Sequence, residues 1–167
     1  ARPMDYSQGG MRNAIRKSYH PIGSEAMSQG TRCRQLAEYA VFEAPLTMLC
    51  DSPSNYMAEP ECTEFIAGFP TVWDERVGVC GEIGEYVAVA RRSGDIWYIG
   101  ALTNWDARDL TLDLNFIGDG NMTVFQDGIN ADRAARDYKK TSAKIPADGI
   151  VKIHLAPGGG WVARITR

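Results

Sequence analysis

The pattern of apolar and polar residues changes character near residue 70. Between residues 28 and 50, apolar residues recur at steps of three and four, and most charged and amide residues fall between them. This period predicts one amphipathic helix over residues 28–50, with Ser28 as its N-cap and Pro45 as the point where its regular part kinks or ends. The apolar stripe of this helix consists of Cys33, Leu36, Ala37, Ala40, Val41, Ala44 and Met48.

From Thr71 onward the period becomes two. Three runs alternate apolar with polar residues, which is typical of strands with one buried face. Two further runs are apolar on both faces, so they are expected to be central or doubly covered strands, joined by a hairpin turn at Gly94. The alternating runs span residues 110–116, 151–155 and 161–166, and the doubly apolar runs span 86–90 and 96–102. Short strands separated by turn residues predict an antiparallel β-sandwich of about eight strands.

The remaining residues before position 70 show weaker signals. Residues 7–27 are rich in Ser, Gly and Pro and have no sustained period, so we expect a long loop. A short helix is expected to begin at Pro60. Glu59, Glu61 and Glu64 lie near its start, where negative charge complements the helix dipole. This position favours a structural role for the three carboxylates over a catalytic one.

A helix with one apolar stripe must bury that stripe against another layer. The sandwich could cover the stripe of residues 28–50, or a partner outside this chain could. We expect the second arrangement. Val41 is then expected to face outward, and a Val41→Glu exchange is expected to reduce self-association of the chain.

Composition and charge exclude several classes of protein. The chain has 167 residues, a formal net charge of −3 and a pI of about 5.4, so no nucleic-acid partner is expected. No apolar run approaches the roughly 20 residues of a membrane-spanning helix, so no membrane partner is expected either. Cys33, Cys50, Cys62 and Cys80 lack the close spacing of a zinc site and are expected to be buried or half-buried thiols.

No common catalytic or nucleotide-binding motif occurs in the sequence, and single residues leave alternatives open. Asp5 either ends a strand in a site or caps the following turn. His20, in the long loop, either binds a polar ligand or is solvated. Trp97 and Trp161 share a face with core residues and are expected to be buried. Trp105 lies between polar residues and is the better candidate for a sugar-stacking surface.

Several motifs resemble, in order, the C-terminal part of enzymes of glycoside hydrolase family 97. Residues 2–6 read RPMDY and residues 27–37 read MSQGTRCRQLA, and both resemble the end of the catalytic barrel of that family. The resemblance continues through residues 49–56, 70–75, 84–92, 97–101, 125–131 and 154–160. It implies a mostly β fold. Residues 1–69 would be a helical remnant of a (β/α)8 barrel, namely its last strand, loop and helix, and residues 70–167 the C-terminal β-sandwich domain.

The family consists of calcium-dependent α-glucosidases and α-galactosidases, typically periplasmic. The resemblance implies that the catalytic carboxylates and the calcium ligands lie upstream of RPMDY. We therefore expect no catalytic residue and no metal ligand in this chain, and no hydrolysis by the chain alone. The chain starts with Ala1 rather than Met, and we expect it to be a C-terminal fragment with a bracing or oligomerisation role. The alternative is a carbohydrate-binding β-sandwich module.

The resemblance also implies partners and contact residues. The expected partners are the remainder of the catalytic barrel, an oligosaccharide substrate bound by the whole enzyme, and a second copy in a homo-oligomer. In a βα barrel the loops that follow the strands form the active-site face. The candidate substrate contacts are therefore Asp5, Tyr6, Tyr19 and His20.

Overall fold

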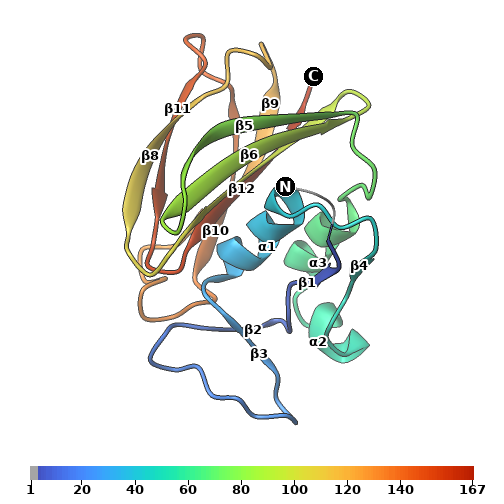
Figure 1. The fold of residues 1–167 in the computed structure, drawn as a ribbon, viewed down its shortest axis with the longest axis vertical. Coiled ribbons are helices and arrows are strands. Elements are labelled where there is room, and N and C mark those ends of the chain that lie inside the picture. Colours follow the sequence, from blue (N-terminus) through green and yellow to red (C-terminus); the bar gives the residue numbers. More distant parts are fainter. Residues whose placement is uncertain (1–3) are drawn as a thin grey trace.

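A computed structural model describes residues 4–167 of the chain. Figure 1 shows a strand-rich region, formed by the later part of the chain, and a smaller region of helices and short strands beside it. The described residues form twelve strands and three helices, which is more than the expected eight strands because four short strands precede residue 49. No helix in this part of the chain has the length and apolar character needed to cross a membrane.

The strand-rich region is built on one six-stranded antiparallel sheet with the strand order β10-β9-β12-β7-β6-β5. Its strands are β5 (Glu75–Glu82), β6 (Tyr86–Ser93), β7 (Ile96–Thr103), β9 (Asn121–Asp127), β10 (Tyr138–Lys144) and β12 (Gly160–Thr166). A second layer consists of β8 (Arg108–Asp113) and β11 (Ile150–Leu155), which pair antiparallel and pack on one face of the large sheet. The antiparallel sheet arrangement predicted from the alternating runs is therefore present.

The alternating runs form the core between these two layers. Leu112 of β8 and Leu155 of β11 are fully buried and belong to one apolar core with residues of the large sheet. His154, on the opposite face of β11, is exposed. Trp97 and Trp161 are 5% and 3% exposed in this core, which confirms their predicted burial.

The other face of the large sheet is covered by helix α1 (Arg32–Val41), which packs on β7 and β12. This is why β6 and β7 are apolar on both faces. At Gly100 of β7, a Cβ atom would lie 2.6 Å from the carbonyl oxygen of Ala37, so only glycine allows this close approach of helix and strand. Four members of the predicted stripe have no exposed surface at all: Cys33, Leu36, Ala37 and Ala40.

The sandwich therefore covers the apolar stripe, and our expectation that a partner outside the chain covers it is wrong. Val41 does not face outward. It is 8% exposed, and its Cγ2 atom lies 2.9 Å from the position of a Cβ at Gly100. Six of the seven predicted stripe residues are buried, whereas Met48, which lies outside the helix, is 47% exposed. The period could not show which layer covers the stripe.

The helix is shorter than the predicted span of residues 28–50 at both ends. Its N-cap is Thr31, whose hydroxyl accepts a hydrogen bond of 3.0 Å from the backbone N–H of Arg34. Ser28 instead lies in a strand, and its hydroxyl donates to the carbonyl oxygen of Gln8. The helix ends at Val41, four residues before Pro45, which is consistent with the loss of helical backbone ahead of a proline.

Two pairs of short parallel strands lie beside α1 (Figure 1). β1 (Tyr6–Ser7) pairs with β4 (Thr47–Met48), and β2 (Arg12–Ala14) pairs with β3 (Met27–Gln29) within the stretch expected to be a loop. Because β1 and β4 are parallel and α1 connects them, they form a β-α-β crossover. One crossover does not by itself show a barrel.

Helices α2 (Pro53–Met57) and α3 (Pro60–Ala67) follow β4. The start of α3 at Pro60 confirms the prediction for that segment. Its Phe65 ring lies 4.6 Å from the ring of Phe125 in β9, so α3 packs on the large sheet next to α1. Within residues 4–167 all four cysteines are free thiols; Cys33 and Cys62 are buried and Cys80 half-buried, whereas Cys50 is exposed, contrary to expectation.

Candidate functional site

The start of α1 is surrounded by a buried polar network that holds the segment after β1. Arg32 is fully buried, and its guanidinium donates to the side chain of Asn13 and, at 2.6 Å, to the carbonyl oxygen of Met11. It also forms an ion pair of 3.2 Å with Glu59, ahead of α3. One cation therefore joins the loop, α1 and α3, and this explains why an arginine can be buried here.

Gln35, one turn further along α1, binds the same segment. Its amide nitrogen donates to the carbonyl oxygens of Gly9 and Gly10 at 3.1 and 3.0 Å, and its amide oxygen accepts from Asn13. From the other side, the carboxylate of Asp51, shortly after β4, accepts a 2.6 Å hydrogen bond from the backbone N–H of Met11. Residues 9–13 are therefore fixed at the ends of β1 and β4.

Asp127 attaches the start of α1 to the sandwich. Its carboxylate accepts hydrogen bonds from the Thr31 hydroxyl at 2.6 Å and from the backbone N–H groups of Ala156 and Gly160 at 2.9 and 3.0 Å. Burial raises the pKa of Asp127 to about 6, although these hydrogen bonds favour its charged form. The contact is a fixed joint between the two regions of the molecule.

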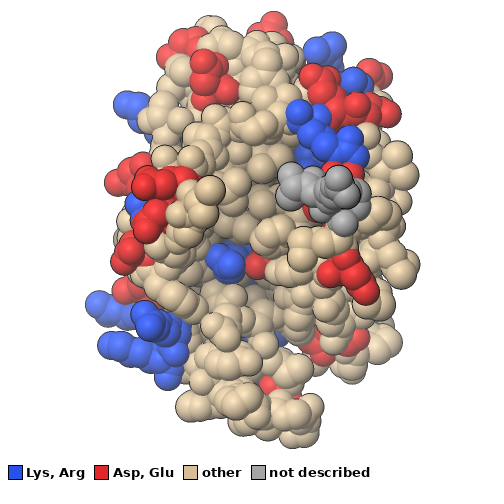
Figure 2. All heavy atoms as spheres, viewed as in Figure 1, with Lys and Arg blue, Asp and Glu red and all other residues tan. Residues whose placement is uncertain are grey.

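A cleft of about 460 Å³ opens beside this joint, between the loop after β1 and two turns of the sandwich. We call it the Tyr19 cleft. The face seen in Figure 2 is hollowed near its middle, between the strands and the helices. The side chains that line the Tyr19 cleft include Tyr6, Gln8, Tyr19, Met27, Gln29, Arg34, Glu38, Asn104 and Trp105.

Two charged residues of α1 lie together in this cleft. The guanidinium of Arg34 is 3.2 Å from the carboxylate of Glu38, one turn away, and it also donates to the carbonyl oxygen of Thr103 at 2.9 Å. Burial raises the pKa of Glu38 to about 7, with Arg34 acting in the opposite direction. The pKa of Tyr6 is raised by burial and, second, by the nearby Glu38.

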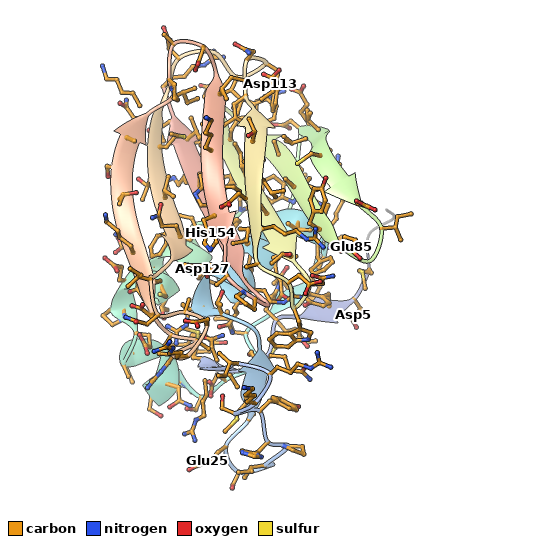
Figure 3. The ribbon with its side chains drawn as sticks, turned by 90° about the vertical axis from the view of Figure 1, so that its left-hand side faces the viewer. Asp5, Glu25, Glu85, Asp113, Asp127 and His154 are labelled. Atoms are coloured by element: carbon orange, nitrogen blue, oxygen red, sulfur yellow. The ribbon has the colours of Figure 1, made fainter. Side chains whose placement is uncertain are left out.

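The structure divides the four predicted contact residues into two groups. Tyr6 and Tyr19 line the Tyr19 cleft, whereas Asp5 and His20 are exposed outside it. The Tyr6 ring packs 4.6 Å from the ring of Phe42 at the end of α1, so Tyr6 faces the helix. Successive side chains of a strand point to opposite faces, so Ser7 faces away from α1, and Asp5 lies immediately before β1. Figure 3 shows Asp5 beside β1, and Glu25 at the far end of the loop that follows.

The other candidates from the sequence have structural surroundings. Trp105 is half-buried rather than exposed, and a Cβ at Gly158 would lie 2.4 Å from its ring, so one part of the ring packs on that turn. Glu59 binds Arg32, and Glu61 accepts a 2.7 Å hydrogen bond from the Tyr138 hydroxyl. These carboxylates fix α3 to its neighbours.

In the part of the chain that the structure describes, no group of three or more His, Cys, Asp or Glu side chains could hold a metal ion. Residues 4–167 therefore contain no acidic cluster that fits a calcium ion.

Sequence reasoning named Tyr6, Tyr19 and Trp105 of the cleft but missed Asp127 of the joint and the polar residues of α1. Arg32 and Gln35 lie off the apolar stripe, so the helical period indicates exposure for both, and only the tertiary structure shows their burial. Arg34 and Glu38 do carry a local signal, because opposite charges at a spacing of four residues pair along a helix.

Comparison with known proteins identifies relatives along the whole chain. A retaining alpha-galactosidase of Bacteroides thetaiotaomicron is 59% identical over 165 residues, which are 98% of this chain and 25% of that protein. A probable retaining alpha-galactosidase of Streptomyces bingchenggensis is 28% identical over 133 residues, 74% of this chain and 21% of that protein. The chain thus spans about a quarter of the length of these curated relatives.

Solved structures show the same arrangement. A glycoside hydrolase family 97 enzyme from Pseudoalteromonas sp. strain K8, in complex with panose, superposes with a TM-score of 0.83 at 29% identity, over 99% of this chain and 26% of that one. A beta-arabinopyranosidase superposes with a TM-score of 0.72 over 83% of this chain and 22% of that one. The sequence model described as "Glycosyl-hydrolase 97 C-terminal, oligomerisation" matches residues 72–166, more than half of the chain. The chain therefore belongs to glycoside hydrolase family 97, and its sandwich is the C-terminal domain of that family.

Proposed function

We propose that this chain is the C-terminal part of a retaining α-galactosidase, to which it contributes the end of the catalytic barrel and an oligomerisation domain. The observation that carries the proposal is the parallel β1-α1-β4 crossover, followed by α3 and joined to the sandwich by Asp127. Parallel strands with helical crossovers are the repeating unit of a βα barrel. The 59% identity to a retaining α-galactosidase supports the substrate class and the reaction.

The crossover refines the proposed domain division of residues 1–69 and 70–167. Residues 1–69 contribute two parallel strands, β1 and β4, rather than the single last strand expected from the sequence. The partner of this region is the remainder of the barrel in the parent enzyme. We propose a periplasmic location for the parent enzyme, because the family that the chain resembles is typically periplasmic.

The direction of the side chains on β1 and β4 supports an assignment of the substrate side. Tyr6 is paired with Thr47 and faces α1, on the outside of the unit, whereas Ser7 and Met48 share the opposite face. The same alternation, continued to the residue before β1, assigns Asp5 to that opposite face. In a βα barrel that opposite face points inward, and substrate lies at the carboxyl ends of the strands. Asp5 is therefore the proposed substrate contact of β1. Tyr6 packs between β1 and α1 and so fixes the strand on its outer side. Tyr19 and His20 lie in the segment that follows the carboxyl end of β1.

The chain does not supply the catalytic pair in this proposal. Retaining hydrolysis uses two carboxyl groups about 5–5.5 Å apart, one as nucleophile and one as acid and base. Glu38, the buried carboxylate of the Tyr19 cleft, is paired with Arg34, and Asp127 is bound by Thr31 and two backbone N–H groups. Both carboxylates are committed to structure. The nucleophile, the acid and the calcium that the family uses are therefore assigned to the upstream part of the parent.

The alternative of a carbohydrate-binding module depended on an exposed Trp105. Its ring is half-buried and one part of it packs on the turn at Gly158, so it offers less free surface for sugar stacking than the exposed ring that this alternative assumed. We therefore favour the role as part of a larger enzyme.

The test compares the chain alone with a chimera in which the upstream three quarters of the B. thetaiotaomicron enzyme precede it. We expect no hydrolysis of p-nitrophenyl α-galactoside by the chain alone and clear hydrolysis by the chimera. In the chimera, Asp5→Asn is expected to lower kcat/KM by about tenfold or more. The matched control is Asp95→Asn, in the exposed β6–β7 turn, with unchanged activity. Turnover by the chain alone, or a folded but inactive chimera, would contradict the proposal.

A further inference from the structure

A second hollow continues from the Tyr19 cleft along one flank of α1. It has a volume of about 420 Å³ and shares Arg34 and Asn104 with the cleft. We call it the α1 groove. One wall is α1, through Arg34 and Phe42; the other is the β5–β6 hairpin, residues 81–87, with residues 102–104 of β7 and the turn after it. Arg34, Glu38 and Phe42 are four residues apart, so they lie along one side of the helix.

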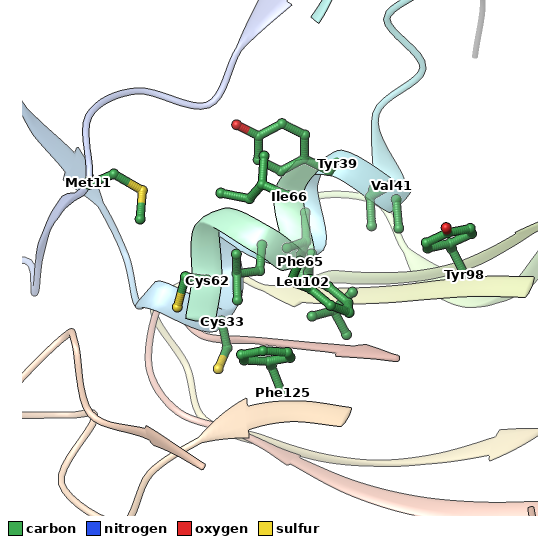
Figure 4. Packing of buried hydrophobic residues seen from close by; sticks show 14 of the residues in the cluster. Met11, Cys33, Tyr39, Val41, Cys62, Phe65, Ile66, Tyr98, Leu102 and Phe125 are labelled. Atoms are coloured by element: carbon green, nitrogen blue, oxygen red, sulfur yellow. The ribbon is translucent and has the colours of Figure 1, made fainter. Parts of the chain in front are cut away.

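The opposite flank of α1 is already covered by a helix. Figure 4 shows Cys62, Phe65 and Ile66 of α3 lying against Cys33 and Tyr39 of α1. The Tyr39 ring also stacks at 5.6 Å on Phe69, just after α3. The two flanks of α1 therefore differ: one packs on α3, a later helix of the chain, and the other borders an open groove.

The order of elements in a βα barrel predicts which element covers the open flank of α1. In a βα barrel each helix packs between the helix before it and the helix after it. α3 comes after α1 and β4 in the chain and occupies the side of a following helix, so the open side is that of the preceding helix. β1 borders this side too: Tyr6 lines the Tyr19 cleft, and in the described part of the chain β1 pairs with a strand along one edge only.

The surface of the groove has the character of a covered interface. Phe42, Tyr86, Val87 and Leu102 line it. Ile83, at the tip of the β5–β6 hairpin, is fully exposed in this chain although it lies at the rim. An element seated in the groove would cover Ile83 together with the half-buried side chains of Phe42 and Tyr86. Glu82, beside Ile83 and also at the rim, favours an occupant with a basic residue at that end.

We propose that the α1 groove receives an amphipathic helix of the parent's catalytic barrel, the helix that precedes β1, and that the β5–β6 hairpin packs over it through Ile83. This inference rests on the proposed function, because the occupant lies in the part of the parent that this chain, a quarter of the length of its relatives, does not contain. The sandwich would then contact the barrel at two places, at α1 itself and at the preceding helix.

Cross-linking in the chimera tests the occupant directly. A photo-reactive phenylalanine analogue replaces Ile83 in one variant and Ile129, which is 95% exposed on a different loop, in the control. After irradiation, peptide mass spectrometry is expected to find the residue at 83 joined to the helix immediately upstream of β1. The residue at 129 is not expected to reach that helix. Links from position 83 to a second copy or to another domain would overturn the proposal.

The thermal stability of an Ile83 variant tests the same contact independently of cross-linking. Ile83→Asp is expected to lower the unfolding midpoint of the chimera by about 2–4 °C and to leave the chain alone unchanged, because Ile83 contacts solvent there. Ile129→Asp is expected to change neither. If the chimera is active and its Ile83→Asp and Ile129→Asp variants have equal unfolding midpoints, the groove proposal is overturned. An inactive, unfolded parent chimera would instead contradict the proposed function, so the two failures are distinguishable.

Discussion

The sandwich and the region before it bury their apolar residues in different ways. In the sandwich, β8 and β11 meet the large sheet, and every member of the resulting core lies between Val77 and Ile165. In the earlier region, the β1–β4 pair packs on α1 with one face only. Its other face leaves Leu46 70% and Met48 47% exposed. The sandwich contains both layers of its core, whereas the β-α-β unit has a layer on one side alone.

Helix α1 packs against both regions, so the two regions share a second apolar core. Its apolar stripe belongs to a second core that includes Met11 and Tyr56 from the first region and Leu102, Phe125 and Val162 from the sheet. The sandwich therefore needs α1 to cover its second face. The β-α-β unit needs the sandwich on the outside and a further layer on the inside, which is the physical basis for assigning it to a larger enzyme.

The largest effect is expected where the sandwich core is opened. Leu112→Ala removes a fully buried side chain between the two layers and is expected to lower the free energy of unfolding by about 2–5 kcal/mol, measured by urea denaturation. The matched variant Leu46→Ala, on the free face of the β1–β4 pair, is expected to change it by less than about 0.5 kcal/mol. A loss of similar size from Leu46→Ala would mean that this face is already covered in solution by another copy.

The next effect concerns the network around Arg32. Arg32→Met leaves the buried side chain of Asn13, the carbonyl of Met11 and Glu59 without their cation, so a loss of about 2–3 kcal/mol is expected. Hydrogen exchange should rise first in residues 9–13, because those are the groups that the network holds. Arg12→Met, whose side chain is exposed and paired with Glu25, is the control and should leave exchange there unchanged.

The Tyr19 cleft should make stability depend on pH. Burial raises the pKa of Glu38 to about 7, so the folded chain binds a proton more tightly than the unfolded chain does. The stability from this proton is fully present below the ordinary glutamate pKa and is lost as pH rises through about 7. Between pH 5 and pH 8 the unfolding midpoint of the wild type should fall, by the equivalent of about 1–3 kcal/mol.

Glu38→Gln should flatten this profile, because glutamine keeps the shape of the protonated acid without the titration. Asp127, whose pKa burial raises to about 6, contributes in the same direction and remains in the variant, so the difference between the two profiles isolates Glu38. Parallel profiles for variant and wild type would show that Glu38 is ionised without cost in the folded chain.

The sequence was informative wherever one period decided burial. Alternation predicted the strands β8, β11 and β12, and runs apolar on both faces predicted that β6 and β7 are covered twice. For β12 the predicted single buried face was wrong, because α1 covers its second face and Val162 is fully buried. The period of α1 named its buried stripe but not the layer opposite, because Gly100 and the strand beneath it are distant in sequence. Arg32 and Gln35 were missed because burial of a polar residue depends on partners that folding brings together.

The short strands show a second limit. β1 and β4 have two residues each, too few for any period, so residues 47–48 were assigned to the end of a helix. Only their parallel pairing across α1 revealed the crossover. The same holds for Asp5: the sequence named it as a candidate, and the proposal that it faces inward depends on the packing of Tyr6 on Phe42.

The smallest effect is expected at the acidic residues before and in α3. Glu61 accepts a hydrogen bond from Tyr138 and lies 3.4 Å from the ammonium of Lys140, and both side chains of this ion pair are about 40% exposed. Exposed ion pairs of this kind contribute little, so Glu61→Gln should change the free energy of unfolding by no more than about 0.5 kcal/mol. In the chimera, kcat and KM for p-nitrophenyl α-galactoside should both stay unchanged. A drop in kcat with normal stability would move Glu61 from a structural contact between α3 and β10 to the chemistry, because only a catalytic role separates the two measurements.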